Sequence, residues 1–141
     1  MKHYLPVMSL QRLLMLTFKV VLILIINHFT ARISSGADLH VPVEYHTIQA
    51  AINAANDGDT VWVANGYYTG PENRLLNFSG KDIILCSEGG AQNCVIDCEN
   101  TTRALVVDHG EPLSALFSGF TILNGRSSAI YCSESSITIE N

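Results

Sequence analysis

Pairs of apolar residues recur along the chain at a constant spacing, and one position separates the two residues of each pair. The pairs are Val61 with Val63, Ile83 with Leu85, and Leu105 with Val107. Because alternate residues of a strand face the same side, each pair predicts the buried side of one short strand. A spacing of about 22 residues suits one coil of a β-solenoid, where equivalent positions of successive coils stack on each other. The spacing therefore favours a solenoid over a sandwich or a barrel.

A second repeat is nearly literal. The residues TILN at 121–124 return as TIEN at 138–141, with the threonine, isoleucine and asparagine unchanged. In a parallel solenoid like residues stack along the axis, and asparagine side chains can form amide ladders. We therefore expect Asn124 and Asn141 to lie in one such ladder.

The remaining chain reads as short apolar or alternating runs separated by turn residues. Turns are signalled at Asn65-Gly66, Glu88–Gly90 and Asn124-Gly125 among other places. Glycine supplies positive φ at such turns, and asparagine and aspartate tolerate it. The predicted strands are Thr60–Ala64, Asp82–Cys86, Cys94–Asp97, Ala104–Asp108, Ala115–Phe117, Phe120–Leu123, Ala129–Cys132 and Ser136–Ile139.

One short amphipathic helix is predicted between residues 46 and 57. Thr47 can cap its start with its hydroxyl, and Gly58 can take positive φ after its end. Four apolar residues fall in one stripe at helical spacing. The stripe consists of Ile48, Ala51, Ile52 and Ala55. Because the strand at 60–64 follows after a very short turn, we expect the helix to cover an apolar surface next to that strand, either the face of a sheet or the open end of a solenoid.

The chain resembles the right-handed parallel β-helix proteins of the pectin-lyase-like superfamily. The resemblance rests on TIQAAINAANDGDTVWVANGYYTG at 47–70, GKDIILCSEGGAQNCVIDCEN at 80–100, SGFTILNG at 118–125 and AIYC at 129–132. In the pattern of its short repeated segments, the chain is most similar to secreted and surface β-helix repeat proteins of bacteria, including the polymorphic outer-membrane type. It implies an all-β, right-handed parallel β-helix with an N-terminal amphipathic cap helix. The superfamily includes lyases, hydrolases, esterases and non-catalytic adhesins, so the resemblance does not choose an activity.

The first 37 residues have the pattern of a signal peptide. No acidic residue occurs before Asp38, and an apolar run from Leu13 to Ile26 precedes the small residues at 34–37. Cleavage after Ala37 would leave residues 38–141 as the cap and first coils of a β-helix. We expect this domain to be truncated at Asn141, because the residue pattern of one coil ends there and no polar terminal cap follows. A membrane anchor is the alternative for the leader, but Lys19 interrupts the run, and spanning needs about 20 apolar residues.

Charge limits the partners. Residues 38–141 hold four basic against thirteen acidic residues, a net charge of −9. Such a body should repel nucleic acid and anionic lipid, so we expect no nucleic-acid partner. A membrane would be contacted only through an uncleaved signal or a missing C-terminal anchor. We expect the protein to be secreted or at the cell surface.

Four cysteines lie in this exported part, namely Cys86, Cys94, Cys98 and Cys132. Export permits disulfides, and a bond between Cys86 and Cys94 is one of several pairings that the sequence leaves open. If the stretch from Cys94 to Cys98 is extended, about 13 Å separates the two α-carbons, which is too far for a disulfide. The alternative is that the cysteines are small buried residues inside the coils.

No catalytic constellation can be assembled from the sequence. The histidines at 40, 46 and 109 do not sit at metal or triad spacing, and no GxSxG, HExxH or phosphate loop occurs. Six carboxylates could hold calcium or act as an acid and base pair, although their positions suit ordinary turns. These are Asp57, Asp59, Asp82, Asp97, Glu99 and Asp108. For the lyase members, the resemblance would require a calcium-binding aspartate group with an arginine base, and the single Arg74, Arg103 and Arg126 do not match that pattern.

Two further kinds of site are open. The aromatic residues Trp62, Tyr67 and Tyr68 could form a sugar-binding face, because aromatic rings stack on pyranose CH groups. Asn77 and Asn100 begin N-glycosylation sequons, which matter only in a eukaryotic source. The sequence thus favours a non-catalytic structural, adhesive or glycan-binding module without a cofactor. The alternative is the N-terminal part of a polysaccharide lyase, hydrolase or esterase, with calcium in the lyase case.

Overall fold

The computed structural model describes Lys19 and residues 36–141. The predicted signal peptide, residues 1–37, therefore lies almost wholly outside the described residues. Within the described part, no helix is both long enough and apolar enough to cross a membrane. Residues 36–141 belong to one compact unit, and the following paragraphs concern that unit alone.

Residues 36–141 form short parallel strands. Three sheets run through the unit, with strand orders β1-β2-β5-β8-β11 in sheet A, β3-β6-β9 in sheet B and β4-β7-β10 in sheet C. Every pairing between strands is parallel. The strands are β1 (Asp38–Val41), β2 (Thr60–Val63), β3 (Gly66–Tyr68), β4 (Leu76–Asn77), β5 (Ile84–Ser87), β6 (Cys94–Asp97), β7 (Leu105–Val107), β8 (Leu116–Ser118), β9 (Thr121–Leu123), β10 (Ile130–Cys132) and β11 (Thr138–Glu140).

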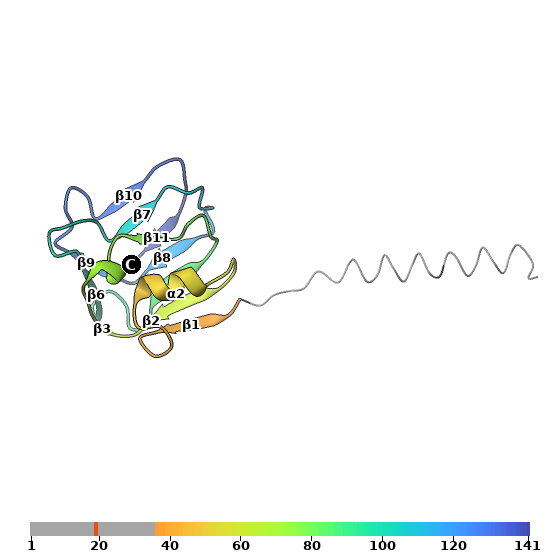
Figure 1. The fold of residues 1–141 in the computed structure, drawn as a ribbon, viewed down its shortest axis with the longest axis horizontal. Coiled ribbons are helices and arrows are strands. Elements are labelled where there is room, and N and C mark those ends of the chain that lie inside the picture. The colour runs from red at the N-terminus through yellow and green to blue at the C-terminus, as the bar shows by residue number, and fades with distance from the viewer. Residues whose placement is uncertain (1–18, 20–35) are drawn as a thin grey trace, which may run out of the picture. The chain divides into compact units, whose positions relative to one another are not determined.

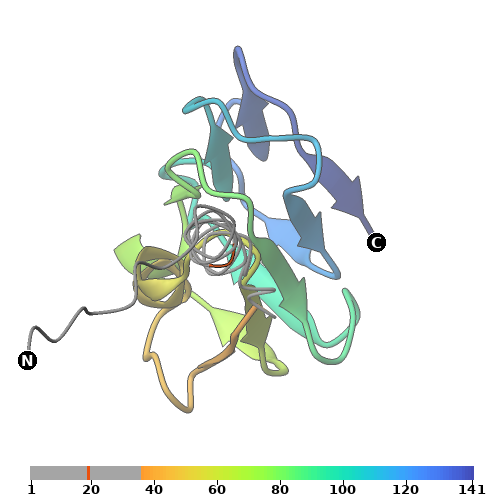
Figure 2. The ribbon, with the colours of Figure 1, turned by 90° about the vertical axis from the view of Figure 1, so that its right-hand side faces the viewer.

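The chain visits the three sheets in the same order in each coil. After β1, the strands β2, β3 and β4 make one coil, β5, β6 and β7 the next, and β8, β9 and β10 the third, before β11 returns to sheet A. Successive coils stack from the orange and yellow β1 and β2 to the blue β10 and β11 (Figure 1). The turned view shows the same succession along sheet A (Figure 2). The predicted all-β, parallel β-solenoid is confirmed.

The core fills the inside of the coils. Inward positions alternate with outward ones, as in β2 and β5, where every second residue is buried. Each fully buried large apolar side chain stabilises the fold by about 1.5–3 kcal/mol relative to exposure. The largest of these side chains are Phe78, Ile48, Ile52, Leu76, Ile83, Leu85, Ile96, Leu105, Val41, Val61, Val63 and Val107.

The predicted cap helix is confirmed, although it is shorter than expected. Helix α2 spans Ile48–Ala54 rather than residues 46–57. The Thr47 side chain accepts a hydrogen bond from the backbone N–H of Ala50 at 3.3 Å, as predicted for the N-cap. The whole apolar stripe is buried. The helix ends early because the backbone is extended at Ala55.

Asp59 explains this early end. Its buried carboxylate accepts hydrogen bonds from the backbone N–H of Asn56 and of Ala37, each at 2.7 Å. The bond from Asn56 draws the chain out of the helix and toward β2. These two bonds hold the pKa of Asp59 below its ordinary value, and the bond from Asn56 has the larger effect. The carboxylate considered as a calcium ligand thus acts as a connector between the start of β1 and the segment after α2.

Helix α2 covers the first strands of sheets A and C. It contacts β1, β2 and β4 and the short 3₁₀ helix η1 (Pro71–Asn73). The side-chain amide of Gln49 accepts from the backbone N–H of Asn77 at 3.0 Å and donates to its carbonyl at 3.1 Å. Asn77 lies on β4, one of the two edge strands of sheet C, so Gln49 satisfies backbone groups that a neighbouring strand would otherwise satisfy.

Lys81 completes the attachment of the cap. Its ammonium group donates to the backbone carbonyls of Ile52 at 2.8 Å, Asn53 at 3.0 Å and Ala55 at 2.8 Å. The last carbonyls of a helix lack partners within the helix and carry partial negative charge, so a cation is favoured there. The second coil thus holds the C-terminal end of α2 in place.

The predicted strands all exist, and their ends are only slightly displaced. Three further strands, β1, β3 and β4, were not predicted. The turn predicted at Asn65-Gly66 does end β2, as a short corner at Ala64-Asn65, and the chain resumes at once as the unpredicted strand β3 at Gly66. Corners in a solenoid join strands of different sheets, so a turn signal there does not end the strand region.

The predicted register is also wrong. Val61 stacks on Leu85 and not on Ile83, while Leu105 belongs to sheet C and pairs with Leu76. The TILN and TIEN segments lie in different sheets, because β9 pairs with β6 and β11 with β8. The predicted asparagine ladder of Asn124 and Asn141 therefore does not form. Coils differ in length because their turns differ, so a constant spacing misaligns them.

Candidate functional site

The three aromatic residues predicted to form a sugar-binding face do not share one. The Trp62 indole N–H, on β2 of sheet A, donates to Asp38 at 2.9 Å. Tyr68 is directed into the coil, where burial raises its pKa to about 12 and its hydroxyl donates to the carbonyl of Ala64 at 2.8 Å. Tyr67 is 59% exposed on β3 of sheet B. The prediction of a joint face is wrong, because adjacent residues of a strand point to opposite sides.

Tyr67 instead lies in a polar cluster that crosses the three coils of sheet B. We call Tyr67, Asp97, Asn124, Arg74 and Glu99 the Tyr67 cluster. The Tyr67 hydroxyl donates a hydrogen bond to Oδ2 of Asp97. Asn124 donates its side-chain amide to Oδ1 of Asp97 at 2.9 Å. The cluster therefore connects β3, the end of β6 and the turn after β9.

Hydrogen bonding shifts the pKa values of Asp97 and Tyr67 in opposite directions. Asp97 is buried, and the bonds from Tyr67 and then Asn124 lower its pKa below the ordinary value. The same bond to Asp97 raises the pKa of Tyr67. At neutral pH the cluster therefore contains a carboxylate and a protonated phenol, and the phenol is tethered at its hydroxyl end.

The outer part of the cluster is an ion pair. The Arg74 guanidinium pairs with the Glu99 carboxylate, which also accepts the backbone N–H of Gly70 at 3.2 Å. Glu99 and Asn124 both have left-handed backbones, with φ of 52° each. Both residues lie in the turns by which the chain leaves sheet B, Glu99 two residues after the end of β6 and Asn124 one residue after the end of β9. Neighbouring strands are about 4.8 Å apart, so the row from Tyr67 to Asn124 is about 10 Å long.

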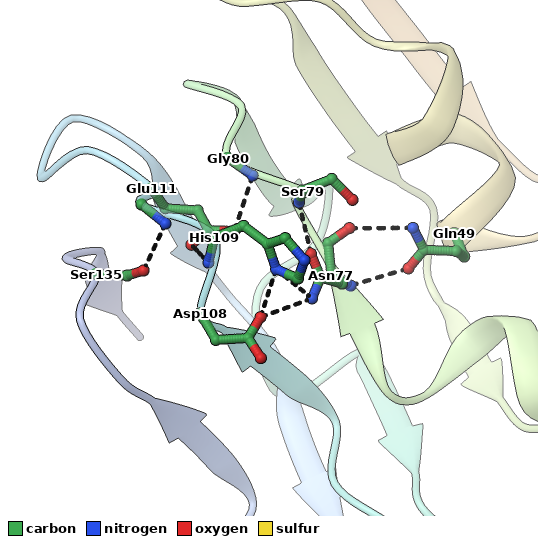
Figure 3. Close-up of polar contacts among 9 residues, drawn as sticks. Gln49, Asn77, Ser79, Gly80, Asp108, His109, Glu111 and Ser135 are labelled. Atoms are coloured by element: carbon green, nitrogen blue, oxygen red, sulfur yellow. Dashed lines mark hydrogen bonds and ion pairs between the residues drawn. The ribbon is translucent and has the colours of Figure 1, made fainter.

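A second network joins the turns after sheet C, and we call it the stacked-turn network (Figure 3). Asn77 donates its side-chain amide to Asp108 at 3.1 Å, and the Asp108 carboxylate lies 2.5 Å from Nδ1 of His109. The other atom of the Asn77 amide, Oδ1, accepts the backbone N–H of Ser79 at 2.6 Å. The network thus links the turn of the first coil with that of the second.

Glu111 holds the same turns together from inside. It is only 2% exposed, and its carboxylate accepts the backbone N–H of Gly80 at 3.0 Å and of His109 at 2.9 Å. Burial alone would raise the pKa of Glu111, but the backbone bonds lower it below its ordinary value. Ser135, in the third coil, accepts the backbone N–H of Gly110 at 2.8 Å. Sequence reasoning missed this role, because a glutamate beside a glycine and a proline has the appearance of an ordinary turn residue.

The stacked-turn network lacks the parts of a nucleophilic site. Asp108 and His109 form a pair, but no serine hydroxyl or cysteine thiol of the described residues is bonded to His109. His40 is not part of this network, and its Nδ1 lies 3.4 Å from Oε1 of Glu88. Within residues 36–141 and at Lys19, no three His, Cys, Asp or Glu side chains are grouped so that they could hold a metal ion.

The remaining carboxylates considered as ligands bind neighbouring coils. Asp57 accepts the backbone N–H of Asp82 at 2.9 Å, and Asp82 accepts the hydroxyl of Ser114 at 2.8 Å. These bonds connect three successive coils at the start of sheet A. Of the arginines, Arg103 lies over the ring of Tyr131, with 5.1 Å from its guanidinium carbon to the ring centre, and donates to Ser128.

All four cysteines are free thiols in the structure. Cys94 and Cys98 are buried, Cys86 is half-buried, and Cys132 is exposed. Burial raises the pKa of Cys86 and of Cys94 to about 11, and it raises that of Cys98 as well. A raised pKa keeps these thiols protonated and poorly reactive at neutral pH.

The comparisons with known proteins leave the site to be interpreted from its own geometry. No protein-family model, curated protein or solved structure matches this chain.

Proposed function

We propose that the chain is a secreted or cell-surface module of the pectin-lyase-like superfamily that binds glycans at the Tyr67 cluster without catalysing their cleavage. The parallel solenoid with its cap helix and the four sequence phrases quoted above support the superfamily. The leader pattern supports export. The observation that carries the binding proposal is the ring of Tyr67, 59% exposed and fixed by its hydroxyl to Asp97.

The chemistry of the cluster suits a sugar. A tethered aromatic ring loses little conformational freedom when a pyranose stacks on it, so the contact is less costly to form. The exposed Glu99 and Asn124 offer a carboxylate oxygen and a side-chain carbonyl to sugar hydroxyls, while the buried Asp97 holds the ring of Tyr67 in position. Few such polar groups beside an aromatic surface are enough to orient a ligand.

Charge selects among glycans. The exported part has a net charge of −9, and two carboxylates border Tyr67. Polymers of uronic acids would be repelled by this field, whereas neutral or amino sugars would not. We therefore propose a neutral or amino glycan as the ligand, and no nucleic-acid partner.

Binding can be measured by affinity gel electrophoresis and calorimetry with a neutral β-glucan, chitosan and polygalacturonate. Tyr67→Ala should weaken binding to the neutral or amino polymer about tenfold, as expected when a central aromatic contact of about 1.4 kcal/mol is removed. Tyr131→Ala is the matched control, since Tyr131 is also exposed but lies on β10 of sheet C. Equal affinity of wild type and Tyr67→Ala would contradict the proposal, as would release of reducing ends from any of the polymers.

A further inference from the structure

The two N-glycosylation sequons occupy different environments in the folded chain. We infer that Asn100, and not Asn77, is the position at which the folded protein carries an N-linked oligosaccharide. This inference concerns the chain as a eukaryotic secretory pathway processes it, and it rests on the export that forms part of the proposed function. It adds a modification site next to the Tyr67 cluster.

The Asn77 side chain is fully engaged in the stacked-turn network. Its Nδ2 donates to Asp108 at 3.1 Å and lies 3.3 Å from Nδ1 of His109, and its Oδ1 accepts the backbone N–H of Ser79 (Figure 3). Phe78, the middle residue of this sequon, is completely buried. A sugar on Nδ2 would have to replace the contacts with Asp108 and His109.

The strand context adds a second obstacle at Asn77. Its backbone N–H and carbonyl both bond the Gln49 amide of the cap helix. The sequon therefore lies between the cap and the turn of the next coil. A chain glycosylated there before folding could not close this part of the solenoid in its present form.

The Asn100 sequon has neither obstacle. Asn100 and Thr101 are both exposed, and Asn100 has a left-handed backbone with φ of 56° at the outside of a turn. Its side-chain amide makes no hydrogen bond to another described residue, while its backbone N–H donates to the carbonyl of Asn124 at 2.9 Å. The backbone thus holds the turn in place, and the side chain is free to be modified.

The donor is a lipid-linked oligosaccharide diphosphate of the eukaryotic secretory pathway. In the transfer, Nδ2 of Asn100 forms a bond to the anomeric carbon of the first sugar, and the bond from that carbon to the diphosphate oxygen breaks. The amide gives up one proton, and the lipid diphosphate leaves. No oxidation or reduction takes place. The product keeps one amide hydrogen and one carbonyl on the side chain.

The position of Asn100 has a consequence for ligand binding. Glu99 precedes it in the chain, and the carbonyl of Asn124 accepts its backbone N–H, so two members of the Tyr67 cluster are direct neighbours. An oligosaccharide at Asn100 would occupy solvent beside the Glu99 and Asn124 side of the Tyr67 cluster. We therefore expect the glycosylated form to bind an external glycan more weakly than the unglycosylated form.

The test is expression of the full chain in a eukaryotic secretory host, followed by digestion with an amidase that removes N-linked glycans. Two variants each destroy one sequon and leave both asparagines in place. Thr102→Ala removes the sequon of Asn100, and Ser79→Ala removes that of Asn77 while its backbone N–H can still bond Asn77. Electrophoretic shift and the mass of the tryptic peptides show which asparagine is occupied.

We expect secreted wild type and Ser79→Ala to carry one glycan at Asn100, and secreted Thr102→Ala to carry none. A secreted wild-type protein without a glycan overturns the inference and leaves the proposed function standing. A glycan found on Asn77 of the secreted protein does so as well. Protein that stays in the cytosol without a glycan overturns both the inference and the proposed export.

Discussion

Gln49 offers a direct test of how the solenoid is closed at its first coil. Its side-chain amide forms two hydrogen bonds with the backbone of Asn77 on the edge strand β4, at 3.0 and 3.1 Å. The substitution Gln49→Met keeps the length of the side chain and a similar helix propensity but removes both hydrogen-bonding atoms. Any loss of stability then reports on the pairing of the edge and not on helix formation.

The expected loss follows from the two bonds. Each neutral hydrogen bond contributes about 1 kcal/mol net, so Gln49→Met should lower the free energy of unfolding by about 2 kcal/mol. For a domain of about 100 residues this corresponds to a fall in Tm of about 8–16 °C. The unpaired edge of β4 should also promote self-association at high concentration.

Urea unfolding followed by circular dichroism measures the free energy, and gel filtration measures the association. The matched control is Asn53→Ala, which removes the bond between Gln49 and Asn53 at 2.9 Å but leaves both bonds to Asn77. It should leave the stability within about 0.5 kcal/mol of wild type, as is usual for surface substitutions. If Gln49→Met is as stable as Asn53→Ala, the amide does not close the sheet edge, and the reasoning fails.

Three further predictions concern the body of the solenoid. The pKa of Asp59 in the folded protein lies below its ordinary value, so the stability that this carboxylate gives the fold should be complete above about pH 4 and be lost as the pH falls through the lowered pKa. Unfolding of Asp59→Asn at several pH values checks this, and a pH dependence equal to that of wild type would contradict it. Leu85→Ala, inside sheet A, should cost about 2–5 kcal/mol in urea unfolding, and a cost below about 1 kcal/mol would argue against a packed interior. The exposed Cys132 should react with an aromatic disulfide reagent much faster than the buried Cys94, whose pKa is about 11, and mass mapping of first labelling at Cys94 would refute this order.

Most of the strands and the cap helix could be predicted because their signals are local. The stripe of Ile48 and Ile52 depends only on helical spacing, and the alternation of Val61 and Val63 only on the pleat of one strand. The N-cap role of Thr47 is equally local. Such patterns are set by a few neighbouring residues, so they can be recognised without knowledge of the rest of the fold.

The register could not be predicted, because it depends on the lengths of turns. Within sheet A the step from Thr60 to its partner Ile84 is clearly shorter than the step from Ile84 to its partner Leu116. The turn before Leu116 contains the buried Glu111, and the chain there bonds turns of both neighbouring coils. An assumed constant spacing therefore matched Leu105 to a strand of the wrong sheet.

The candidate site was predicted only in part, for a similar reason. The aromatic residues could be named from the sequence, but their sides of the sheet depend on where β3 begins. Because β3 begins at Gly66, Tyr67 points outward and Tyr68 inward. The partners of Tyr67 in the cluster, Asp97 and Asn124, belong to the second and third coils, and only the stacking of coils brings them together.

The stacked-turn network and the Tyr67 cluster differ in the groups that their side chains bond. This difference predicts that substitutions in the first affect stability and substitutions in the second affect ligand binding. Glu111 accepts backbone N–H groups that every folded chain must satisfy, so Glu111→Gln should reduce stability and leave glycan affinity unchanged in the folded fraction. Tyr67 bonds one side chain, the buried carboxylate of Asp97, and leaves its ring in solvent, so Tyr67→Ala should reduce affinity and should reduce stability only by the loss of that one bond. Both variants can be measured by urea unfolding and by calorimetry with the same glycan. If Tyr67→Ala lowers the free energy of unfolding as much as Glu111→Gln does, the Tyr67 cluster only stabilises the stacking of the coils, and the binding site must lie elsewhere.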